Sequence, residues 1–203
     1  MDTPSRKPLI SKRVFMATLA EVRACTLCAG QLPLPPRPIV QLDPRARILI
    51  VGQAPGRKAH DSGTPFNDVS GDRLRAWMGI DRDTFYDARR LAMLPMGFCF
   101  PGTGKGGDLP PRPECAPAWR ERLLALLPRI ELTLVIGRHA LDWHLPALRG
   151  GSVASAVADW RQHWPRVVPM PHPSPRNQRW LRDHPWFEAE VVPALRLRVA
   201  ELI

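Results

Sequence analysis

The stretch RILIVGQAPG (residues 47–56) decides the fold. Its first half is an unbroken apolar run, which is typical of a strand buried on both faces of a sheet. Its second half is a tight turn containing Gly and Pro, which presents backbone N–H groups and one amide side chain. Taken alone the turn is weak evidence for function, because many junctions between strands and helices carry these residues.

Three further apolar runs have the length of strands, and helical patterns lie before, between and after them. The runs are residues 91–96, 132–136 and 166–170, and the helical patterns are 13–24, 71–78, 118–127, 138–148 and 186–203. This alternation predicts an α/β fold, a three-layer α/β/α sandwich around a four-stranded, mainly parallel sheet. The chain of 203 residues fits one domain, with an N-terminal helix and two cysteines in residues 1–45 and an α/β core in residues 46–203.

Two segments follow predicted strands at the edge of the sheet where ligands are expected. Ligands of such sheets bind beyond the carboxyl ends of the strands. GQAPG (52–56) follows the first strand, and PHPSPRN (171–177) follows the last. We therefore expect the two segments to face one crevice.

The charge of the chain favours a polyanionic partner. There are 29 Lys and Arg residues against 19 Asp and Glu, a formal net charge of +10, and most of the positive residues are Arg. The planar guanidinium group suits phosphates, so we expect nucleic acid ahead of a membrane surface. No stretch approaches the length of a membrane span, and residues 1–12 lack the apolar segment of a secretory signal. We expect a cytoplasmic protein with no membrane association.

Four cysteines suggest a metal site. They are Cys25, Cys28, Cys99 and Cys115, and the first two form a C-x2-C pair. In a reducing compartment, four such cysteines are more typical of metal ligands than of disulfides. A set of four thiolates suits either zinc or an iron–sulfur cluster, and the spacing alone leaves both open.

The two segments resemble motifs of the uracil-DNA glycosylase superfamily. After the first turn, Pro65-Phe66 is followed by Ser70-Gly71, and the second segment reads H-P-S-P-R-N from His172. The resemblance implies that Phe66 stacks on a flipped-out base and that His172 donates a hydrogen bond to the departing base. Substrate-binding residues would be Gly52, Gln53, Ala54, Pro55, Gly56 and Phe66, and residues contacting DNA would be Ser174, Pro175, Arg176, Asn177 and Gln178.

The whole chain is most similar to the iron–sulfur branch of that superfamily, known as family four. That branch has a C-x2-C pair ahead of the first motif and two later cysteines about as far apart as those here. The resemblance implies a [4Fe–4S] cluster bound by Cys25, Cys28, Cys99 and Cys115, with zinc as the alternative. Its role would be to tie the N-terminal segment and the loop between Cys99 and Cys115 to the core.

Three positions depart from the family-four pattern. Gln53 stands where that branch has a Glu, and Ala54 stands where other uracil enzymes have a catalytic Asp. Residues 94–98 lack the Asn that recognises the uracil edge. A carboxylate is still expected, either to orient water or to offset the charge on the sugar. Asp68 and Asp61 are the candidates, with Asp68 preferred.

The expected activity is that of a monofunctional DNA glycosylase, a hydrolase of N-glycosyl bonds in base excision repair. It would flip out uracil or another deaminated base, cleave the bond to the sugar, and leave an abasic site in DNA. One molecule suffices for one lesion, so we expect a monomer. The alternative is a non-catalytic or very slow protein of the same fold that binds lesions or abasic sites. A redox-responsive DNA-binding module is a weaker third possibility.

Overall fold

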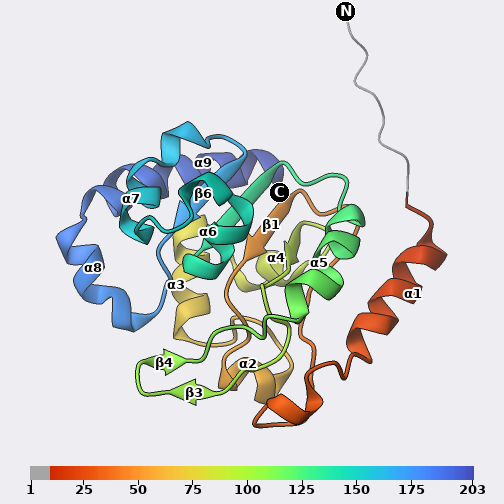
Figure 1. Ribbon diagram of the computed structural model, residues 1–203. Coiled ribbons are helices and arrows are strands. Elements are labelled where there is room, and N and C mark those ends of the chain that lie inside the picture. The colour runs from red at the N-terminus through yellow and green to blue at the C-terminus, as the bar shows by residue number, and fades with distance from the viewer. Residues whose placement is uncertain (1–9) are drawn as a thin grey trace, which may run out of the picture.

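The computed structural model describes residues 10–203 (Figure 1). The expectation of a polar, signal-free start falls largely on residues 1–9, which lie outside the described residues, as does the first part of the predicted 1–45 segment. No helix in the described part of the chain is long and apolar enough to cross a membrane.

A four-stranded parallel sheet forms the centre of the molecule. Its strands are β1 (Ile48–Val51), β2 (Leu91–Met93), β5 (Leu132–Ile136) and β6 (Val167–Met170). The order across the sheet is β2-β1-β5-β6, and every neighbouring pair runs parallel. The predicted α/β class and the four-stranded parallel sheet are confirmed.

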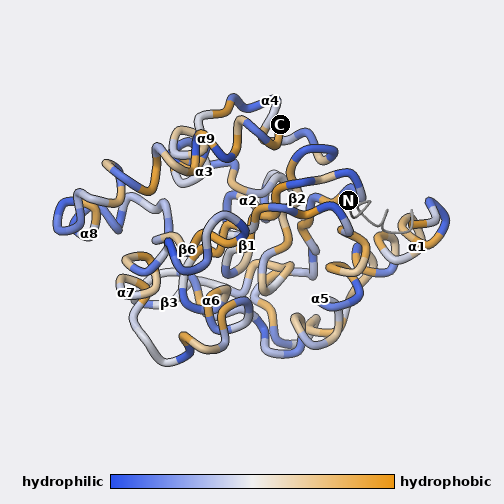
Figure 2. Tube along the Cα trace, turned by 90° about the horizontal axis from the view of Figure 1, so that it is seen from above, coloured by the Kyte–Doolittle hydropathy of each residue, from blue (hydrophilic) through white to orange (hydrophobic). Residues whose placement is uncertain are grey.

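Helices cover both faces of this sheet. They are α1 (Lys12–Arg23), α2 (Arg57–Ser62), α3 (Val69–Met78), α4 (Arg82–Tyr86), α5 (Cys115–Ala125), α6 (Arg138–His144), α7 (Val153–Ala158), α8 (Gln178–Asp183) and α9 (Val192–Leu202). Figure 1 shows α1 and α5 on one side of the sheet and α3 on the other. Figure 2 shows hydrophobic positions gathered along the central strands, whereas the outer end of α8 is hydrophilic.

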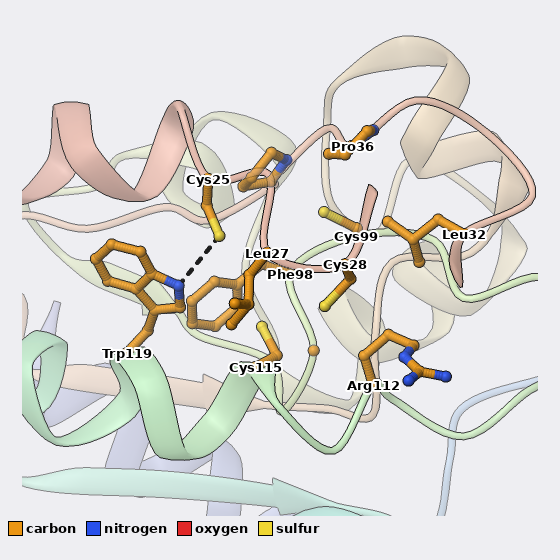
Figure 3. A pocket seen from close by; sticks show the side chains of 12 residues that line it. Cys25, Leu27, Cys28, Leu32, Pro36, Phe98, Cys99, Arg112, Cys115 and Trp119 are labelled. Atoms are coloured by element: carbon orange, nitrogen blue, oxygen red, sulfur yellow. Dashed lines mark hydrogen bonds between the residues drawn. The ribbon is translucent and has the colours of Figure 1, made fainter. Parts of the chain in front are cut away.

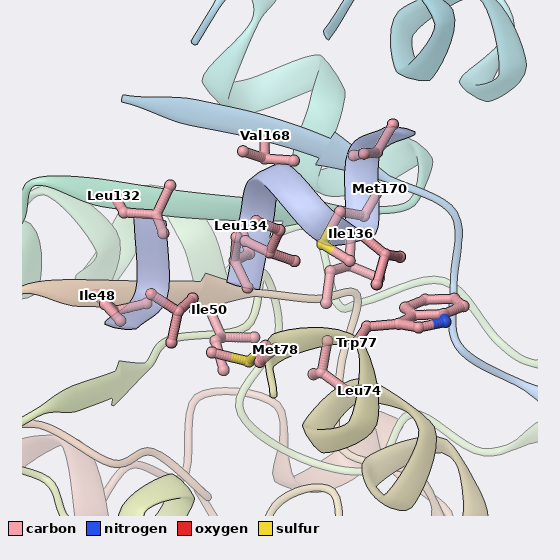
Figure 4. Packing of buried hydrophobic residues seen from close by; sticks show 14 of the residues in the cluster. Ile48, Ile50, Leu74, Trp77, Met78, Leu132, Leu134, Ile136, Val168 and Met170 are labelled. Atoms are coloured by element: carbon pink, nitrogen blue, oxygen red, sulfur yellow. The ribbon is translucent and has the colours of Figure 1, made fainter. Parts of the chain in front are cut away.

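Strand β1 separates two hydrophobic cores. Ile48 and Ile50 belong to the first core, which α3 and α9 complete (Figure 4). Leu49 and Val51 belong to the second core, which receives side chains from α1, α5 and α6. Side chains alternate between the two faces of a strand, so an unbroken apolar run can fill both cores at once. The three layers predicted from the sequence follow from this alternation.

Several predicted elements have different boundaries. The run 91–96 is a strand only to Met93, although the N–H groups of Leu94 and Met96 still donate to carbonyls of Ile50 and Gly52. The helical pattern 138–148 ends at His144, just before Pro146, and the pattern 186–203 divides into a π-helical turn and α9. Proline lacks an N–H donor and disfavours helix at the residue before it, which accounts for the end of α6.

One element was not expected from the sequence. The sequence indicates only a loop between Cys99 and Cys115, but the structure contains a hairpin there, formed by β3 (Thr103–Gly104) and β4 (Gly107–Asp108). The short helices α2, α4, α7 and α8 were not expected either, because each is too short for a clear periodic pattern.

The backbone at Phe66 lies very close to the first turn of α3. Phe66 has a positive φ of 52°, and its carbonyl oxygen lies 1.8 Å from where a Cβ on Gly71 would be. Only a residue without a side chain allows the backbone at Phe66 to approach the helix so closely. Gly71 therefore fixes the position of Phe66 against the fold.

We expect Gly71→Ala to destabilise the protein by about 3 kcal/mol or more, because the new methyl group meets backbone that cannot move freely. The matched control is Gly106→Ala, where a Cβ would have no heavy atom within 4 Å. Urea unfolding of both variants measures the difference. Equal stability of the two variants would contradict the close backbone contact between Phe66 and Gly71.

Candidate active site and cysteine-lined cavity

Phe66 lies directly against the turn that follows β1. A Cβ on Gly52 would lie 3.7 Å from the tip of the Phe66 ring. The Phe66 ring also packs against a second aromatic side chain. Phe85 meets it edge-on, with ring centroids 6.1 Å apart. The Tyr86 hydroxyl donates to the carbonyls of Pro65 at 2.9 Å and of Phe66 at 3.2 Å. The structure thus brings the predicted aromatic platform and the predicted turn together.

His172 is held in one orientation and one tautomer. The backbone N–H of Ser174 donates to its Nδ1 at 3.1 Å, and the Asn177 side chain donates to its carbonyl at 2.8 Å. Burial lowers the pKa of His172 below its ordinary value, while the charges of Asp68 and Asp108 act in the opposite direction. A neutral ring whose Nδ1 accepts a hydrogen bond carries its proton on Nε2. The Nε2–H is therefore the group that His172 can offer to a ligand.

The two predicted carboxylates have different surroundings. Asp68 is the N-cap of α3, and its Oδ1 accepts from the N–H of Gly71 at 2.9 Å. Its charge also acts on His172. Asp61 is exposed on α2 in an ion pair with Arg57 at 2.9 Å. The carboxylates whose charge acts on His172 are Asp68 and Asp108, so the structure associates Asp68, but not Asp61, with the imidazole.

The unexpected hairpin lies across the turn after β1. The Gln53 side-chain amide donates to the carbonyls of Leu109 at 2.8 Å and of Asp108 at 3.3 Å. A Cβ on Gly56 would lie 3.2 Å from Oδ2 of Asp108. Sequence reasoning missed Asp108, although the GKGG stretch before it is a turn signal that could have indicated a hairpin.

The segment after β6 is anchored to α3. The Arg73 guanidinium donates to the carbonyl of Ser174 at 3.2 Å and to the side-chain oxygen of Gln178 at 2.8 Å. The Ser174 hydroxyl accepts from the N–H of Arg176 at 3.2 Å and so caps a short 3-10 turn. Pro175, Arg176 and Gln178 are exposed. The residues predicted to contact DNA therefore form a surface loop with a fixed base.

The backbone at Gly97 packs against the turn after β1. Its N–H donates to the carbonyl of Gln53 at 2.9 Å. A Cβ on Gly97 would lie 2.8 Å from Pro111 and 3.6 Å from the Cβ of Ala54. A larger side chain therefore has no room at this position.

The four cysteines line one cavity (Figure 3). Cys25 and Cys28 follow α1, Cys99 follows the segment after β2, and Cys115 is the first residue of α5. The Trp119 indole N–H donates to the sulfur of Cys25 at 3.3 Å. Apolar side chains, including Leu27, Leu32 and Phe98, also line the cavity.

The cysteines of this cavity are free, and burial disfavours ionisation of three of them. Burial raises the pKa of Cys28, that of Cys99 to about 11 and that of Cys115 to about 12. Across residues 10–203, no three His, Cys, Asp or Glu side chains lie close enough to hold a single metal ion. All four cysteines line the same cavity.

The fold is an α/β/α sandwich in which Phe66 packs on the turn after β1 and the segment after β6 fixes the His172 ring. A family model for the uracil DNA glycosylase superfamily matches residues 39–196, and the chain belongs to that superfamily. The match includes both loops, the hairpin, Cys99 and Cys115, whereas Cys25 and Cys28 lie before it.

The chain is also similar to solved structures, of which one illustrates the match. It is the solution NMR structure of a Methanosarcina acetivorans protein provisionally named a uracil DNA glycosylase. The two chains are 18% identical with a TM-score of 0.49, and the match covers 80% of this chain and 97% of the other.

We expect His172 to titrate with a midpoint below about 6.5, the ordinary value for the side chain. The unfolded chain therefore takes up this proton first as the pH falls, so His172 lowers stability in acid and has no such effect above about pH 6.5. NMR correlation of the ring nitrogens should show the proton on Nε2 at neutral pH, with His172→Gln used for assignment. A midpoint above 6.5, or a proton on Nδ1, would contradict the hydrogen bond from Ser174.

Proposed function

We propose that this protein is a monofunctional DNA glycosylase that removes uracil or another deaminated base and leaves an abasic site. The observation that carries the proposal is the N–H of Ser174 donating to Nδ1 of His172, which leaves the Nε2–H of a neutral imidazole for the base. Membership of the uracil DNA glycosylase superfamily supports the same reaction class.

Cleavage of the glycosidic bond places negative charge on an oxygen of the departing base. A donor fixed in advance stabilises this charge without reorganisation, and one such donor contributes about 2.7–4 kcal/mol. The Nε2–H of His172 is suited to this role because its partner on Nδ1 is the protein backbone, which does not change protonation. A neutral donor also avoids burying an imidazolium cation.

Phe66 supplies the stacking surface for a flipped-out base. Its ring is fixed by Phe85 and by the turn at Gly52, so it does not have to be ordered when the base enters. Stacking of a base on an aromatic side chain is worth about 1–3 kcal/mol and tolerates any base. Stacking therefore helps to offset the cost of extrusion but cannot select uracil.

The Arg-rich surface and the loop 174–178 would contact the DNA. Arg176 is exposed beside the hairpin, since a Cβ on Gly107 would lie 2.6 Å from its guanidinium. Contacts of arginines to phosphates release counterions, so duplex binding should weaken steeply as salt rises. The loop would fill the space left by the extruded base, with one protein monomer for each lesion.

The reaction is tested on duplexes that carry uracil, hypoxanthine or xanthine, under single-turnover conditions with alkaline cleavage of abasic sites. We expect at least one of these bases to be excised, and His172→Ala to lower the rate about 10²–10³-fold while duplex affinity stays unchanged. His163→Ala is the matched control, because His163 lies before β6, at the opposite edge of the sheet.

Two outcomes would overturn parts of this proposal. If no base is excised while lesion or abasic-site DNA still binds, the protein is a lesion-binding member of the superfamily and not an enzyme. If His172→Ala and His163→Ala retain equal rates, the imidazole has no role in the departure of the base.

We also propose that Cys25, Cys28, Cys99 and Cys115 hold a [4Fe–4S] cluster. The proposal is supported by the position of the four cysteines on the lining of one cavity, since such a cluster takes one thiolate on each iron. When bound, the cluster supplies covalent cross-links between the segment after α1, the loop at Cys99 and the start of α5. Hydrolysis needs no redox step, so this role is architectural.

We expect purified protein to be brown, with about four irons per chain and a visible iron–sulfur absorption band. Cys99→Ser should lose colour and iron and unfold at lower temperature, because one cross-link is missing. Thr26→Ser, between the first two cysteines, is the control that should keep the colour. Colourless protein with stoichiometric zinc would reject the cluster in favour of the alternative metal.

A further inference from the structure

The turn after β1 has no acidic side chain at the two positions where related glycosylases carry one. Gln53 and Ala54 occupy these positions, and Ala54 has no polar group to offer. Gln53 uses its amide N–H groups on the carbonyls of Asp108 and Leu109. The turn therefore binds the hairpin instead of presenting a carboxylate of its own.

The hairpin places the carboxylate of Asp108 beside this turn. Oδ1 of Asp108 accepts from the Thr103 hydroxyl at 3.2 Å, across the two strands of the hairpin. Oδ2 points toward Gly56, at the end of the turn, where a Cβ would lie 3.2 Å away. One oxygen is thus held by the hairpin and the other faces the turn.

Asp68 is the other carboxylate near the imidazole, and it has a structural task. Its Oδ1 accepts from the N–H of Gly71 and caps α3. A carboxylate that satisfies a helix N-terminus is stabilised as an acceptor for backbone donors. Asp108 has no helix to cap, so it is the freer of the two to bind a water molecule.

We propose that Asp108 is the carboxylate that binds the attacking water, and that Gln53 is a positioning residue that holds the hairpin over the turn. This inference rests on the proposed glycosylase function. It assigns the catalytic carboxylate to a segment outside both sequence motifs.

The step balances without any further reactant. The bond between C1′ and the base nitrogen breaks, and its electron pair leaves with the base, whose oxygen accepts from the Nε2–H of His172. The water oxygen forms a bond to C1′, and its proton passes to the Asp108 carboxylate and from there to the released base. The negative carboxylate also offsets the positive charge that develops on the sugar.

Other charged groups lie beside the hairpin or act on the same imidazole. Arg176, in the segment after β6, lies beside Gly107, and the charges of Asp68 and Asp108 both act on His172. The turn after β1 contributes the neutral amide of Gln53. The contribution of each group to the rate can therefore be assigned only by removing single groups.

The test is the single-turnover excision rate at neutral pH, on whichever base the wild-type protein removes. Asp108→Asn should lower this rate about 10²-fold or more, because an amide cannot accept the proton of the attacking water. Asp68→Asn should change the rate less than tenfold, because an Asn side chain still caps α3. Asp159→Asn, an exposed site after α7, is the matched control that should behave as wild type.

Gln53→Ala separates positioning from chemistry. Loss of its two hydrogen bonds should lower the maximal single-turnover rate about tenfold while duplex affinity stays unchanged, because Asp108 is still present but is held less firmly. Duplex affinity and thermal unfolding of every variant show whether the fold and binding are intact. A larger loss of rate in Asp68→Asn than in Asp108→Asn would overturn the assignment. So would equal rates for Asp108→Asn and Asp159→Asn. If wild-type protein excises no base, the proposed function fails and not this assignment alone.

Discussion

The structure depends on one strand, β1, being buried on both faces. Its alternate side chains fill two separate cores, so its ends are fixed relative to helices on both sides of the sheet. Because β1 is fixed, the turn that follows Val51 is fixed as well. Phe66 and the hairpin both pack against that turn. A donor or stacking surface must be held to a fraction of an ångström to act on a transition state, and a central parallel strand is a firm support for this purpose.

A buried arginine connects the cysteine-lined cavity to the segment that packs on the turn after β1. Arg120 of α5 is fully buried and donates to the carbonyls of Leu94 and Pro95, in the segment that leads from β2 to Cys99. It also contacts His144 of α6, whose pKa burial and this positive charge lower to about 4. A buried cation without a carboxylate is costly, and the two carbonyls reduce that cost. The same residue thus fixes α5, which begins at Cys115, to the segment that packs on Gln53.

The fold was predictable because its signals are local. The apolar composition of residues 47–51 predicts a strand that is buried on both faces. In a parallel sheet the loops after the first and last strands lie at the same edge, so their position follows from the topology. His172 and Phe66 were found through motif spacing. The fixed tautomer of His172 was not predictable, since it depends on a backbone N–H two residues away. The hairpin was missed because strands of two residues carry no periodic pattern.

The relation between Gln53 and Asp108 shows why a departure from a motif does not by itself remove a function. Read along the sequence, an amide in place of an acid indicates lost chemistry. In the folded protein, that amide donates to a second segment, and the second segment places a carboxylate beside the same turn.

A carboxylate on a hairpin is held less rigidly than one on a turn after a buried strand. Its position then depends on two hydrogen bonds and on the packing of Arg176 against Gly107. Because Arg176 is also expected to contact DNA, binding of the duplex and placement of the carboxylate would be coupled through this one contact.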